Sequence, residues 1–385
     1  MNDLNLYTFI LAVSILLAAG YYLLILIYRF WLKVSAKHQV ATSGFSTGFS
    51  ILIPARNEER NIERCIRSIF ANDYPADLFE VLVVDDFSED DTAKIVQILQ
   101  NQYPQLRLIQ LKNYVDHPIN SYKKKAIETA ILQSDFDFIL TTDADCELPD
   151  TWLAAFDGII RKEDPLFIAA PVKIKYTGTF LSLFQSLDFL SLQGITMAAV
   201  GAGLHTLCNG ANLGYSKEAF YNVDGFKGVD NIASGDDMLL MYKIQEKFPG
   251  RIGYLLSRQA IVETQPMQTW KAFFNQRIRW ASKTGFYDDK KLLPLLLLVY
   301  FFNLDLLLLP VFNFWWPDLI LWWLFLLLVK IVIELFFLWP VARFFGYTRL
   351  LIWFPFLQPF HIVYTVVAGF LGKFGDFEWK GRKVK

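Results

Sequence analysis

Hydrophobic residues gather toward the two ends of this 385-residue chain, while the middle has an ordinary mixture of polar and apolar positions. Residues 7–31 form an apolar run with no charged side chain before Arg29, and residues 292–312 and 319–339 form two more strongly apolar runs. Because a helix needs roughly 20 apolar residues to cross a bilayer, each run predicts a transmembrane helix. The turn between the last two runs is rich in aromatic residues, which is typical of the water boundary of a membrane.

Charged residues around the first run predict its orientation. Asp3 precedes the run, whereas Arg29, Lys33 and Lys37 lie at its end or after it. Basic residues tend to stay on the cytosolic side, so we expect an anchor in the plasma (inner) membrane, with its N-terminus outside and the following residues in the cytosol. A cleaved signal peptide is the alternative, but it would carry basic residues before a shorter apolar core.

Two charged residues interrupt the C-terminal runs, Asp305 and Lys330. Counted from the cytosolic ends of two antiparallel helices, they lie at similar depth, within roughly 6 Å at about 1.5 Å per residue. Charges within a span seldom lack a partner. We therefore predict an Asp305–Lys330 pair, for which Glu334 competes as the i+4 neighbour of Lys330.

A further apolar stretch, residues 350–371, contains Pro355 and Pro359. Proline interrupts helical hydrogen bonding, which suits a re-entrant or interfacial segment. Residues 373–385 carry five basic side chains, and these favour the cytosolic side. We therefore predict three full crossings and a cytosolic tail.

Between about residues 49 and 176, short apolar runs alternate with segments of helical periodicity. The expected strands are 50–53, 81–84, 106–111 and 138–142, and the expected helices are 58–70, 90–100 and 124–133. The strands are continuously apolar rather than alternating, which indicates burial on both faces. The predicted fold class is therefore α/β, with a mostly parallel sheet covered by helices.

This pattern divides the chain into four expected parts. They are an N-terminal transmembrane anchor (1–34), a small polar linker (35–48), a cytosolic α/β domain (49–285) and a C-terminal membrane region with a basic tail (286–385). Within the domain, residues 180–200 form an apolar helix interrupted by Gln185, Asp188 and Gln193. A helix along the membrane surface and a buried core helix both fit this stretch.

Composition excludes several classes of protein. Hydrophobic residues make up 54% of the chain and charged residues 19%, below the roughly 25% usual for soluble domains. The net charge of −1 provides no basic field, so nucleic acid is not an expected partner. The three cysteines and four histidines are scattered, which argues against a disulfide framework and a zinc site.

Polar residues follow three of the predicted strands where each strand ends. They are Pro54, Arg56 and Glu58 after the first strand, Asp85 and Asp86 after the second, and Asp143 and Asp145 after the fourth. Ligands of open α/β sheets bind at the carboxyl ends of the strands. In extended backbone, residues i and i+2 face the same way, so Asp143 and Asp145 can hold one divalent cation. Solvated turn acids, or a helix cap in the case of Asp85 and Asp86, are the alternatives.

Charged residues also lie at the start of two predicted helices, 124–133 and 235–247. The first carries Lys123, Lys124 and Lys125, where the helix dipole disfavours cations unless an anion such as a diphosphate lies nearby. A solvated charge run is the alternative. Asp236 and Asp237 begin the second helix, either as a cap or with one acid as a general base.

A third helix carries Gln276, Arg279 and Trp280 on one face. An arginine can hold a leaving diphosphate, and the flat indole of a tryptophan can support a sugar ring. An interfacial anchor before a membrane span is the alternative for this cluster.

Taken in order, five motifs resemble those of the family-two inverting glycosyltransferases. They are Pro54-Ala-Arg-Asn-Glu58, Asp85-Asp86, Asp143-Ala-Asp145, Gly235-Asp236-Asp237 and Gln276-Arg-Ile-Arg-Trp280. The resemblance implies the GT-A fold and the membrane-bound group that shares the Gln-x-x-Arg-Trp motif, which includes cellulose, chitin and hyaluronan synthases and several lipid glycosyltransferases. It also implies a nucleotide-sugar donor, usually a UDP-sugar, and Mg²⁺ or Mn²⁺.

The resemblance further implies roles for individual residues. By it, Asp86 contacts uracil, Asp145 binds the metal, Asp143 contacts ribose or the metal shell, Asn212 orients the donor sugar, Asp237 is the catalytic base, and Arg279 and Trp280 contact the diphosphate and the acceptor. The other candidates are Pro54, Arg56, Glu58, Lys124 and Gln276 for the donor, and Asp236 beside the base. Two departures stand out, because Asp236 replaces the usual Glu and Phe87 replaces a common Gly.

The expected reaction is a single displacement with inversion, from the nucleotide-sugar to a hydroxyl of a membrane lipid or polyisoprenoid-type acceptor. A subunit of a polysaccharide synthase is the first alternative. The predicted transmembrane helices are, however, too few to form a polysaccharide channel within one chain. An inactive glycosyltransferase-like scaffold is the second. Against it stand Asp143, Asp145 and Asp237, which are all present.

Overall fold

The computed structural model describes residues 3–34, 43–204, 207–230, 232, 235–282, 292–374, 377–379 and 382–384. The chain divides into two compact units. The first comprises Met1–Val34, Gly178–Ala198 and Met267–Trp379, and the second comprises Ser35–Thr177, Ala199–Pro266 and Lys380–Lys385. Residues 35–42 of the expected linker, and residues 283–291, where the expected α/β domain ends, lie outside the described residues.

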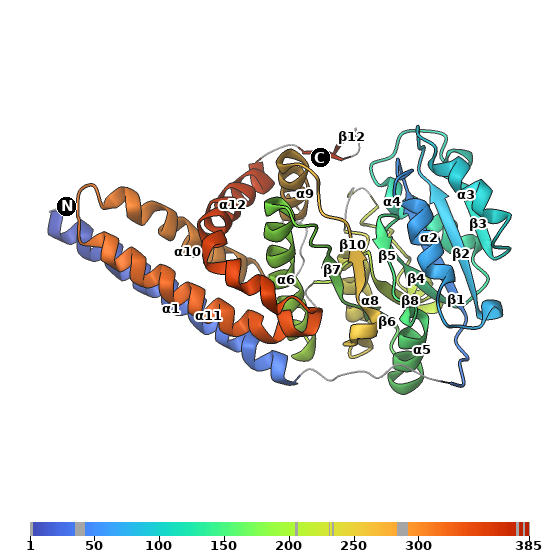
Figure 1. Cartoon of the computed structure of the whole chain (residues 1–385), viewed down its shortest axis with the longest axis horizontal. Helices are drawn as coiled ribbons and strands as arrows, with labels where there is room; N and C mark the ends of the chain where they lie inside the picture. Colours follow the sequence, from blue (N-terminus) through green and yellow to red (C-terminus); the bar gives the residue numbers. More distant parts are fainter. Residues whose placement is uncertain are drawn as a thin grey trace. The chain divides into compact units, whose positions relative to one another are not determined.

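The second unit is built on a seven-stranded sheet (Figure 1). Along the sheet the strands are β3 (Leu106–Gln110), β2 (Phe79–Asp85), β1 (Phe49–Ala55), β4 (Phe138–Thr141), β8 (Leu213–Ser216), β6 (Phe167–Ala169) and β9 (Ile252–Tyr254). β8 runs antiparallel to both of its neighbours, and the other adjacent strands are parallel. The predicted α/β class with a mostly parallel sheet is therefore confirmed.

A smaller three-stranded sheet and several helices complete this unit. The small sheet has the order β5 (Cys146–Glu147), β10 (Val262–Thr264) and β7 (Val172–Ile174). The helices are α2 (Ile62–Phe70), α3 (Thr92–Gln100), α4 (Tyr122–Gln133), α5 (Trp152–Glu163), α7 (Lys217–Asn222) and α8 (Met238–Lys247), with short 3₁₀ turns η1 (Ala76–Leu78), η2 (Leu111–Asn113) and η3 (Arg258–Ala260). A short strand, β12 (Arg382–Val384), lies near the end of the chain.

The central strands are buried on both faces, as their apolar sequences predict. All seven residues of β2 are buried, and Val81 and Leu82, which point to opposite faces, are both 0% exposed. The parallel register pairs Ala55 with Asp85. The carboxyl ends of these strands therefore meet at one edge of the sheet, and the polar residues that follow them are brought together there.

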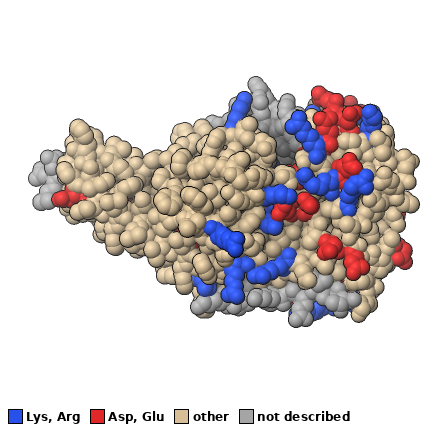
Figure 2. Space-filling model, in the orientation of Figure 1, with Lys and Arg blue, Asp and Glu red and all other residues tan. Residues whose placement is uncertain are grey.

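The first unit is helical. It contains α1 (Asp3–Val34), most of α6 (Phe180–Gly201), α9 (Trp270–Ser282), α10 (Leu292–Phe312), α11 (Leu319–Phe345), η5 (Thr348–Trp353), α12 (Phe354–Phe374) and the short strand β11 (Phe377–Trp379). Within the described residues, five helical stretches are long and apolar enough to cross a membrane, at 5–32, 180–201, 293–312, 319–345 and 348–372. Figure 2 shows the surface over α1, α10 and α11 almost without charged side chains. These features are those of a membrane protein.

Helices α1, α10 and α11 pack against one another (Figure 1). The hydroxyl of Tyr22 donates to the carbonyl oxygen of Leu326 over 3.0 Å, and Nε of Arg29 donates to that of Phe336 over 3.2 Å. Residue numbers therefore rise together along α1 and α11, which run parallel. Helix α10 is joined to α11 by a short turn and runs the opposite way, which is the alternation expected of three successive crossings.

The predicted pair between Asp305 and Lys330 is wrong. Oδ1 of Asp305 accepts a hydrogen bond from Ser14 over 2.8 Å, whereas Nζ of Lys330 lies 2.7 Å from Oε1 of Glu334, the competing partner. The hydroxyl of Tyr21 also donates to Oε1 of Glu334. Ser14 and Tyr21 are seven residues apart on α1, about 10 Å along its axis, so Asp305 and Glu334 lie at different depths.

The structure also decides the expectations for two other apolar stretches, residues 180–200 and 350–371. Most of the apolar window of α6 is buried inside the protein, including Gln185 and Asp188, so α6 is a core helix. The expected interruption at Pro355 and Pro359 is wrong, because α12 is continuous with Pro359 inside it. Pro355 falls in the first turn, where a missing N–H removes no helical bond. The argument for a re-entrant segment is therefore lost, and the side of the membrane on which the tail lies stays a prediction.

Candidate active site

The loop that follows β1 is tied to the loop that follows β2 by the side chain of Arg56. Its Nη1 donates to the carbonyl oxygens of Asp86 and Phe87, each over 2.9 Å. The backbone N–H of Asp86 donates in turn to the carbonyl oxygen of Ala55 over 2.7 Å. Arg56 is only 9% exposed. Its guanidinium therefore holds the two loops in one arrangement at the carboxyl edge of the sheet.

The end of β2 presents two buried carboxylates and one strained residue. Asp85 and Asp86 are 6% and 2% exposed, and Oδ1 of Asp85 has no hydrogen-bond partner among the described residues. Phe87 has a φ of +54°, a left-handed conformation that costs a non-glycine residue about 1–2 kcal/mol. This backbone explains why glycine is common at this position in the family that the motifs resemble. The ring of Phe87 packs edge-to-face on Tyr122, with centroids 5.8 Å apart.

Lys123 lies between two acids that come from distant parts of the chain. Its Nζ is 2.9 Å from Oδ1 of Asp143, which follows β4, and 3.1 Å from Oδ2 of Asp236, which precedes α8. Burial alone lowers the pKa of Lys123, but the negative charges of Asp143 and Asp236 outweigh it and raise the pKa above its usual 10.5. The ammonium group therefore stays charged and offsets part of the negative charge of the two carboxylates.

Asp145 contacts the small sheet. Its Oδ2 accepts a hydrogen bond from the hydroxyl of Thr264 on β10 over 3.2 Å, and Sγ of Cys146 lies 3.7 Å from its Oδ1. Burial, followed by the charges of Asp145 and Asp143, raises the pKa of the thiols of Cys65 and Cys146. Neither cysteine therefore supplies a thiolate ligand at neutral pH.

The acid pair fits a divalent cation that brings other ligands with it. The described part of the chain has no group of three or more His, Cys, Asp or Glu side chains placed to hold a metal. Asp143 and Asp145 offer hard oxygen ligands, and Mg²⁺ is commonly bound by one or two carboxylates together with substrate phosphates and water. The donor set suits such an ion and not a closed protein cage.

Asp237 joins the start of α8 to the loop 209–212. Its Oδ1 accepts the backbone N–H of Met238 over 2.8 Å, so it caps the helix. Its Oδ2 accepts the backbone N–H of Gly210 over 3.1 Å. The carbonyl oxygen of Gly210 accepts the hydroxyl of Thr141, at the end of β4, over 3.1 Å. The sheet edge, the loop and the acid are therefore linked by consecutive hydrogen bonds.

Lys124 stabilises the fold, whereas Lys123 is the lysine that contacts the acids. Lys124 is 2% exposed, and its Nζ donates to the carbonyl oxygens of Val229 and Ile232 over 2.6 and 2.8 Å. The sequence carried no signal that separates the two lysines, because Ile127 lies at i+3 from Lys124 and at i+4 from Lys123.

Asn212 also serves the fold. Its side chain is 0% exposed, and Nδ2 donates to the carbonyl oxygens of Pro171 and Ala260, each over 2.8 Å. Its Oδ1 accepts the indole N–H of Trp152 over 2.9 Å. These bonds hold the loop 209–212 from behind, and the expectation that Asn212 orients a sugar directly finds no support in its contacts.

The remaining predicted residues of the β1 loop frame this edge. Pro54 is the penultimate residue of β1. The backbone N–H of Glu58 donates to the hydroxyl of Thr92 over 2.8 Å, and its Oε2 accepts from Asn61 over 2.9 Å. Glu58 therefore helps to begin α2, and its contact with a donor stays a prediction.

The motif residues Gln276, Arg279 and Trp280 lie on α9 and belong to the first unit. Between them lies Arg277, which the sequence analysis did not single out. Arg277 is 2% exposed and forms an ion pair with Asp188 of α6, with Nη2 and Oδ2 2.8 Å apart. A signal for it was Asp188 itself, because a charge within an apolar helix needs a partner.

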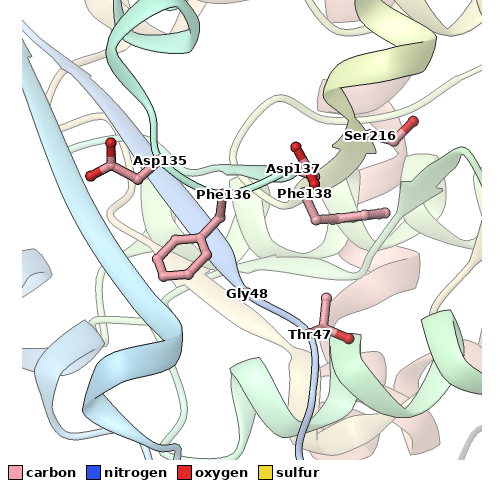
Figure 3. Close-up of a pocket in the computed structure, with 7 residues that line it drawn as sticks. All are labelled: Thr47, Gly48, Asp135, Phe136, Asp137, Phe138 and Ser216. Atoms are coloured by element: carbon pink, nitrogen blue, oxygen red, sulfur yellow. The ribbon is translucent and has the colours of Figure 1, made fainter.

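A hollow in the second unit lies at the opposite edge of the sheet (Figure 3). It measures about 280 Å³ and is lined by Thr47, Gly48, Asp135, Phe136, Asp137, Phe138 and Ser216. Residues 47–48 precede β1 and residues 135–137 precede β4, so the hollow is at the amino ends of these parallel strands. It is separate from the acids at the carboxyl edge.

Parts of this chain are similar to known glycosyltransferases. Residues 50–223 match the model described as glycosyl transferase family 2. The probable glycosyltransferase YdaM of Bacillus subtilis is 25% identical over 240 residues, which cover 60% of this chain and 54% of that protein. A poly-beta-1,6-N-acetyl-D-glucosamine synthase of Staphylococcus epidermidis is 23% identical over 252 residues, or 65% and 56% of the two chains. The chain thus spans little more than half the length of these relatives.

One solved structure extends the likeness to most of the chain. The mannosyltransferase PcManGT from Pyrobaculum calidifontis, in complex with GDP-Man and Mn²⁺, has a TM-score of 0.61 at 18% identity, and the match covers 94% of this chain and 99% of that one. At this identity the likeness concerns the fold. Together with the family match, it shows a GT-A-like fold and, over residues 50–223, a likeness to glycosyl transferase family 2.

Proposed function

We propose that this protein is an inverting glycosyltransferase of the Gln-x-x-Arg-Trp group, which transfers a sugar from a nucleotide-sugar, a UDP-sugar, to a hydroxyl of a lipid or polyisoprenoid-type acceptor. The observation that carries the proposal is the meeting of Asp143, Asp236, Asp237 and Lys123 at the carboxyl edge of the sheet. Residues 49–285 are its cytosolic catalytic region, anchored at the inner membrane by the helices on both sides.

The loops after β1 and β2 form the nucleotide site in this proposal. Asp85 and Asp86 are buried carboxylates at the strand end, and a carboxylate there accepts hydrogen bonds from a nucleobase N–H or a ribose hydroxyl. Arg56 keeps the two loops in register. The base contact is assigned to Asp86, with Pro54 and Glu58 bordering the same site.

Asp145 and Asp143 would hold Mg²⁺ or Mn²⁺ together with the donor diphosphate. The metal, when bound, stabilises the negative charge that develops on the leaving diphosphate. The Mn²⁺ and GDP-Man named for the structurally similar mannosyltransferase support this assignment. Lys123 already lies against Asp143, so its ammonium group is placed to take up a diphosphate oxygen in place of a carboxylate.

Asp237 is the general base in this mechanism. One of its carboxylate oxygens accepts the proton of the acceptor hydroxyl, and the oxygen of that hydroxyl attacks the anomeric carbon from the side opposite the diphosphate. The bond from the anomeric carbon to the diphosphate breaks, so the configuration inverts. Lys123 stabilises negative charge near the acids, and Arg279 and Trp280 of α9 are assigned to the diphosphate and the acceptor.

A subunit of a polysaccharide synthase is the second candidate. It is favoured by one observation, which is that a matched relative is named a poly-beta-1,6-N-acetyl-D-glucosamine synthase. The two candidates differ in the product, because a synthase extends a glycan repeatedly and a lipid glycosyltransferase adds one sugar. The inactive scaffold is disfavoured, since the acids lie together and are linked to ordered backbone.

The experiment that tests the proposal is a donor screen on the purified chain in lipid nanodiscs. UDP-Glc, UDP-GlcNAc and GDP-Man, each with a labelled sugar, are supplied with Mn²⁺ and a total membrane lipid extract. We expect one donor to transfer label into the lipid phase, and mass analysis to show a single added sugar. Label in a long water-soluble glycan would favour the synthase.

Two variants make this screen decisive. Asp237→Asn removes the base and is expected to abolish transfer, whereas Asp135→Asn, at the opposite edge of the sheet, is expected to leave it unchanged. Absence of transfer by the wild-type protein from every donor, with intact folding, would overturn the proposed function.

A further inference from the structure

Arg277 is a buried cation inside the motif segment of α9. Its side chain is 1% exposed, and Asp188 of α6, its ion-pair partner at 2.8 Å, has a side chain that is 6% exposed. Nε and Nη1 of Arg277 have no hydrogen-bond acceptor among the described residues. A charge buried with so few polar partners lowers the stability of the fold, so its presence points to another role.

The guanidinium group of Arg277 lies on aromatic faces. Its Cζ is 4.2 Å from the ring centroid of Trp280 and 5.0 Å from that of Phe273. Arginine over an indole at this distance is a cation–π contact, which is stronger when the pair is removed from water. Trp280 is also contacted from α6, because the ring of Phe189 lies 6.0 Å from it.

Asp188 and Phe189 are neighbours on α6, so this one helix fixes both supports of the indole. Asp188 holds Arg277, and Arg277 stacks on Trp280, while Phe189 borders the same indole. A neutral side chain at position 188 would leave the guanidinium group without its counter-ion.

We infer that the Arg277–Asp188 pair is a positioning device that sets the orientation of Trp280 for the acceptor. The inference rests on the proposed function, in which Trp280 contacts the acceptor. Arg277 does not touch the reacting atoms and acts through the indole. The ligand is a sugar or a lipid-linked sugar. Its apolar face would rest on the indole of Trp280, whose orientation is fixed by the pair.

A second set of contacts connects this pair to helices α12 and α11. Nε2 of His361, on α12, lies 3.8 Å from Oδ1 of Asp188. Three residues earlier on α12, the side chain of Gln358 accepts from Lys330 over 2.7 Å and donates to Glu334 over 2.8 Å. Helix α12 therefore presents one polar residue to Asp188 and another to α11. The pair is held in place by helices, and not by a loop.

The test replaces both charges at once, because a single substitution leaves a buried charge unpaired and can unfold the protein. The variant is Asp188→Leu with Arg277→Met, which has side chains of similar size. Its matched control is Ser14→Ala with Asp305→Leu, which removes a partly buried polar contact of the first unit, between α1 and α10. Thermal melts in detergent establish that each variant is folded.

The first readout is independent of activity. The chain has 11 tryptophans, and ¹⁹F NMR of protein labelled with 5-fluorotryptophan resolves them, with Trp280 assigned by its loss in Trp280→Phe. We expect the Trp280 resonance to shift in the Asp188→Leu, Arg277→Met variant and to stay in place in the control. A Trp280 resonance that does not move in the folded double variant would overturn the inference.

The second readout separates acceptor from donor. The double variant is expected to raise the acceptor KM roughly 2- to 30-fold, the range of a lost cation–π contact, while the donor KM stays within about twofold. Unchanged kinetics for both substrates would also overturn the inference. If the wild-type protein transfers no sugar, the proposed function fails, and the NMR result alone decides whether the pair orients Trp280.

Arg277→Lys provides a second variant if the double one does not fold. It keeps a positive charge beside Asp188 but lacks the planar group that stacks on the indole. We expect the same shift of the Trp280 resonance with a near-normal melt. A resonance that matches the wild type in Arg277→Lys would show that charge alone suffices, and would contradict the role assigned to stacking.

Discussion

The backbone N–H of Gly210 donates a hydrogen bond to Oδ2 of Asp237 over 3.1 Å. A glycine is suited to this place, because a Cβ there would lie 3.2 Å from both Oδ2 of Asp236 and Nζ of Lys123. A side chain at position 210 would therefore crowd both groups. The contact fixes the carboxylate that we assign as the base against ordered backbone.

Gly210→Ala is therefore expected to impair catalysis more than folding. The added methyl group displaces Lys123 and Asp236 by a few tenths of an ångström, and misplacement of this kind lowers rates by about tenfold or more. Steady-state kinetics and a thermal melt measure the two effects. Gly253→Ala on β9, where the new Cβ has ordinary contacts of 3.4 Å, is the control, and equal loss of activity in both would contradict the account.

Lys123→Met is expected to change ligand binding, whereas Lys124→Met is expected to change stability. In the proposed site Lys123 competes with the metal for Asp143, so its removal should strengthen binding of Mn²⁺ alone several-fold and weaken binding of the donor. Lys124 satisfies two carbonyl oxygens in the interior, so its removal should lower the free energy of unfolding by about 1–3 kcal/mol with little change in Mn²⁺ affinity. Calorimetric titration with Mn²⁺ and unfolding curves separate the two. The reverse pattern would place Lys124, and not Lys123, in the site.

Asn212→Ala is expected to act through stability. It removes three hydrogen bonds and leaves the indole N–H of Trp152 and two carbonyl oxygens buried without their partner. At about 1 kcal/mol for each lost bond, and more for unsatisfied groups, unfolding should become easier by about 3 kcal/mol. Unfolding curves measure this change. A variant of wild-type stability with weak donor binding would instead assign Asn212 to the sugar.

Glu263→Gln is expected to change the pH dependence of stability. Burial raises the pKa of Glu263, but Lys173 and Lys175, at 3.0 and 3.1 Å, outweigh it and lower the pKa below its usual 4.5. A carboxylate with a lowered pKa stabilises the folded state above pH 4.5 and loses this contribution as the pH falls through its folded-state pKa. The free energy of unfolding of the wild type should therefore exceed that of the variant by about 1 kcal/mol at neutral pH.

That difference should shrink below pH 4.5, as measured by unfolding curves at several pH values. Glu246→Gln, at an exposed position on α8, is the control and should show a smaller difference. A constant difference from pH 7 to pH 3 would contradict the role of the ion pairs with Lys173 and Lys175.

The sequence predicted the sheet because the central strands contain uninterrupted apolar runs, such as Val81-Leu-Val-Val84 in β2. It also predicted the place of the acids, since parallel strands such as β1 and β2 end at one edge. It did not distinguish Lys123 from Lys124. Which of two adjacent lysines is buried can be told only when the buried face of α4 is known. The partners of Asp305 and Lys330 depend on the register of α1 against α10 and α11, which composition does not encode.

The most direct test of the central claim is the anomeric configuration of the product, determined by ¹H NMR with an α-linked nucleotide-sugar donor, for the wild type and for Asp237→Asn. The account predicts a β-linked product from the wild type and a loss of transfer of at least about 100-fold in the variant, with donor affinity within a few-fold. An α-linked product, or near-normal transfer by Asp237→Asn, would contradict it.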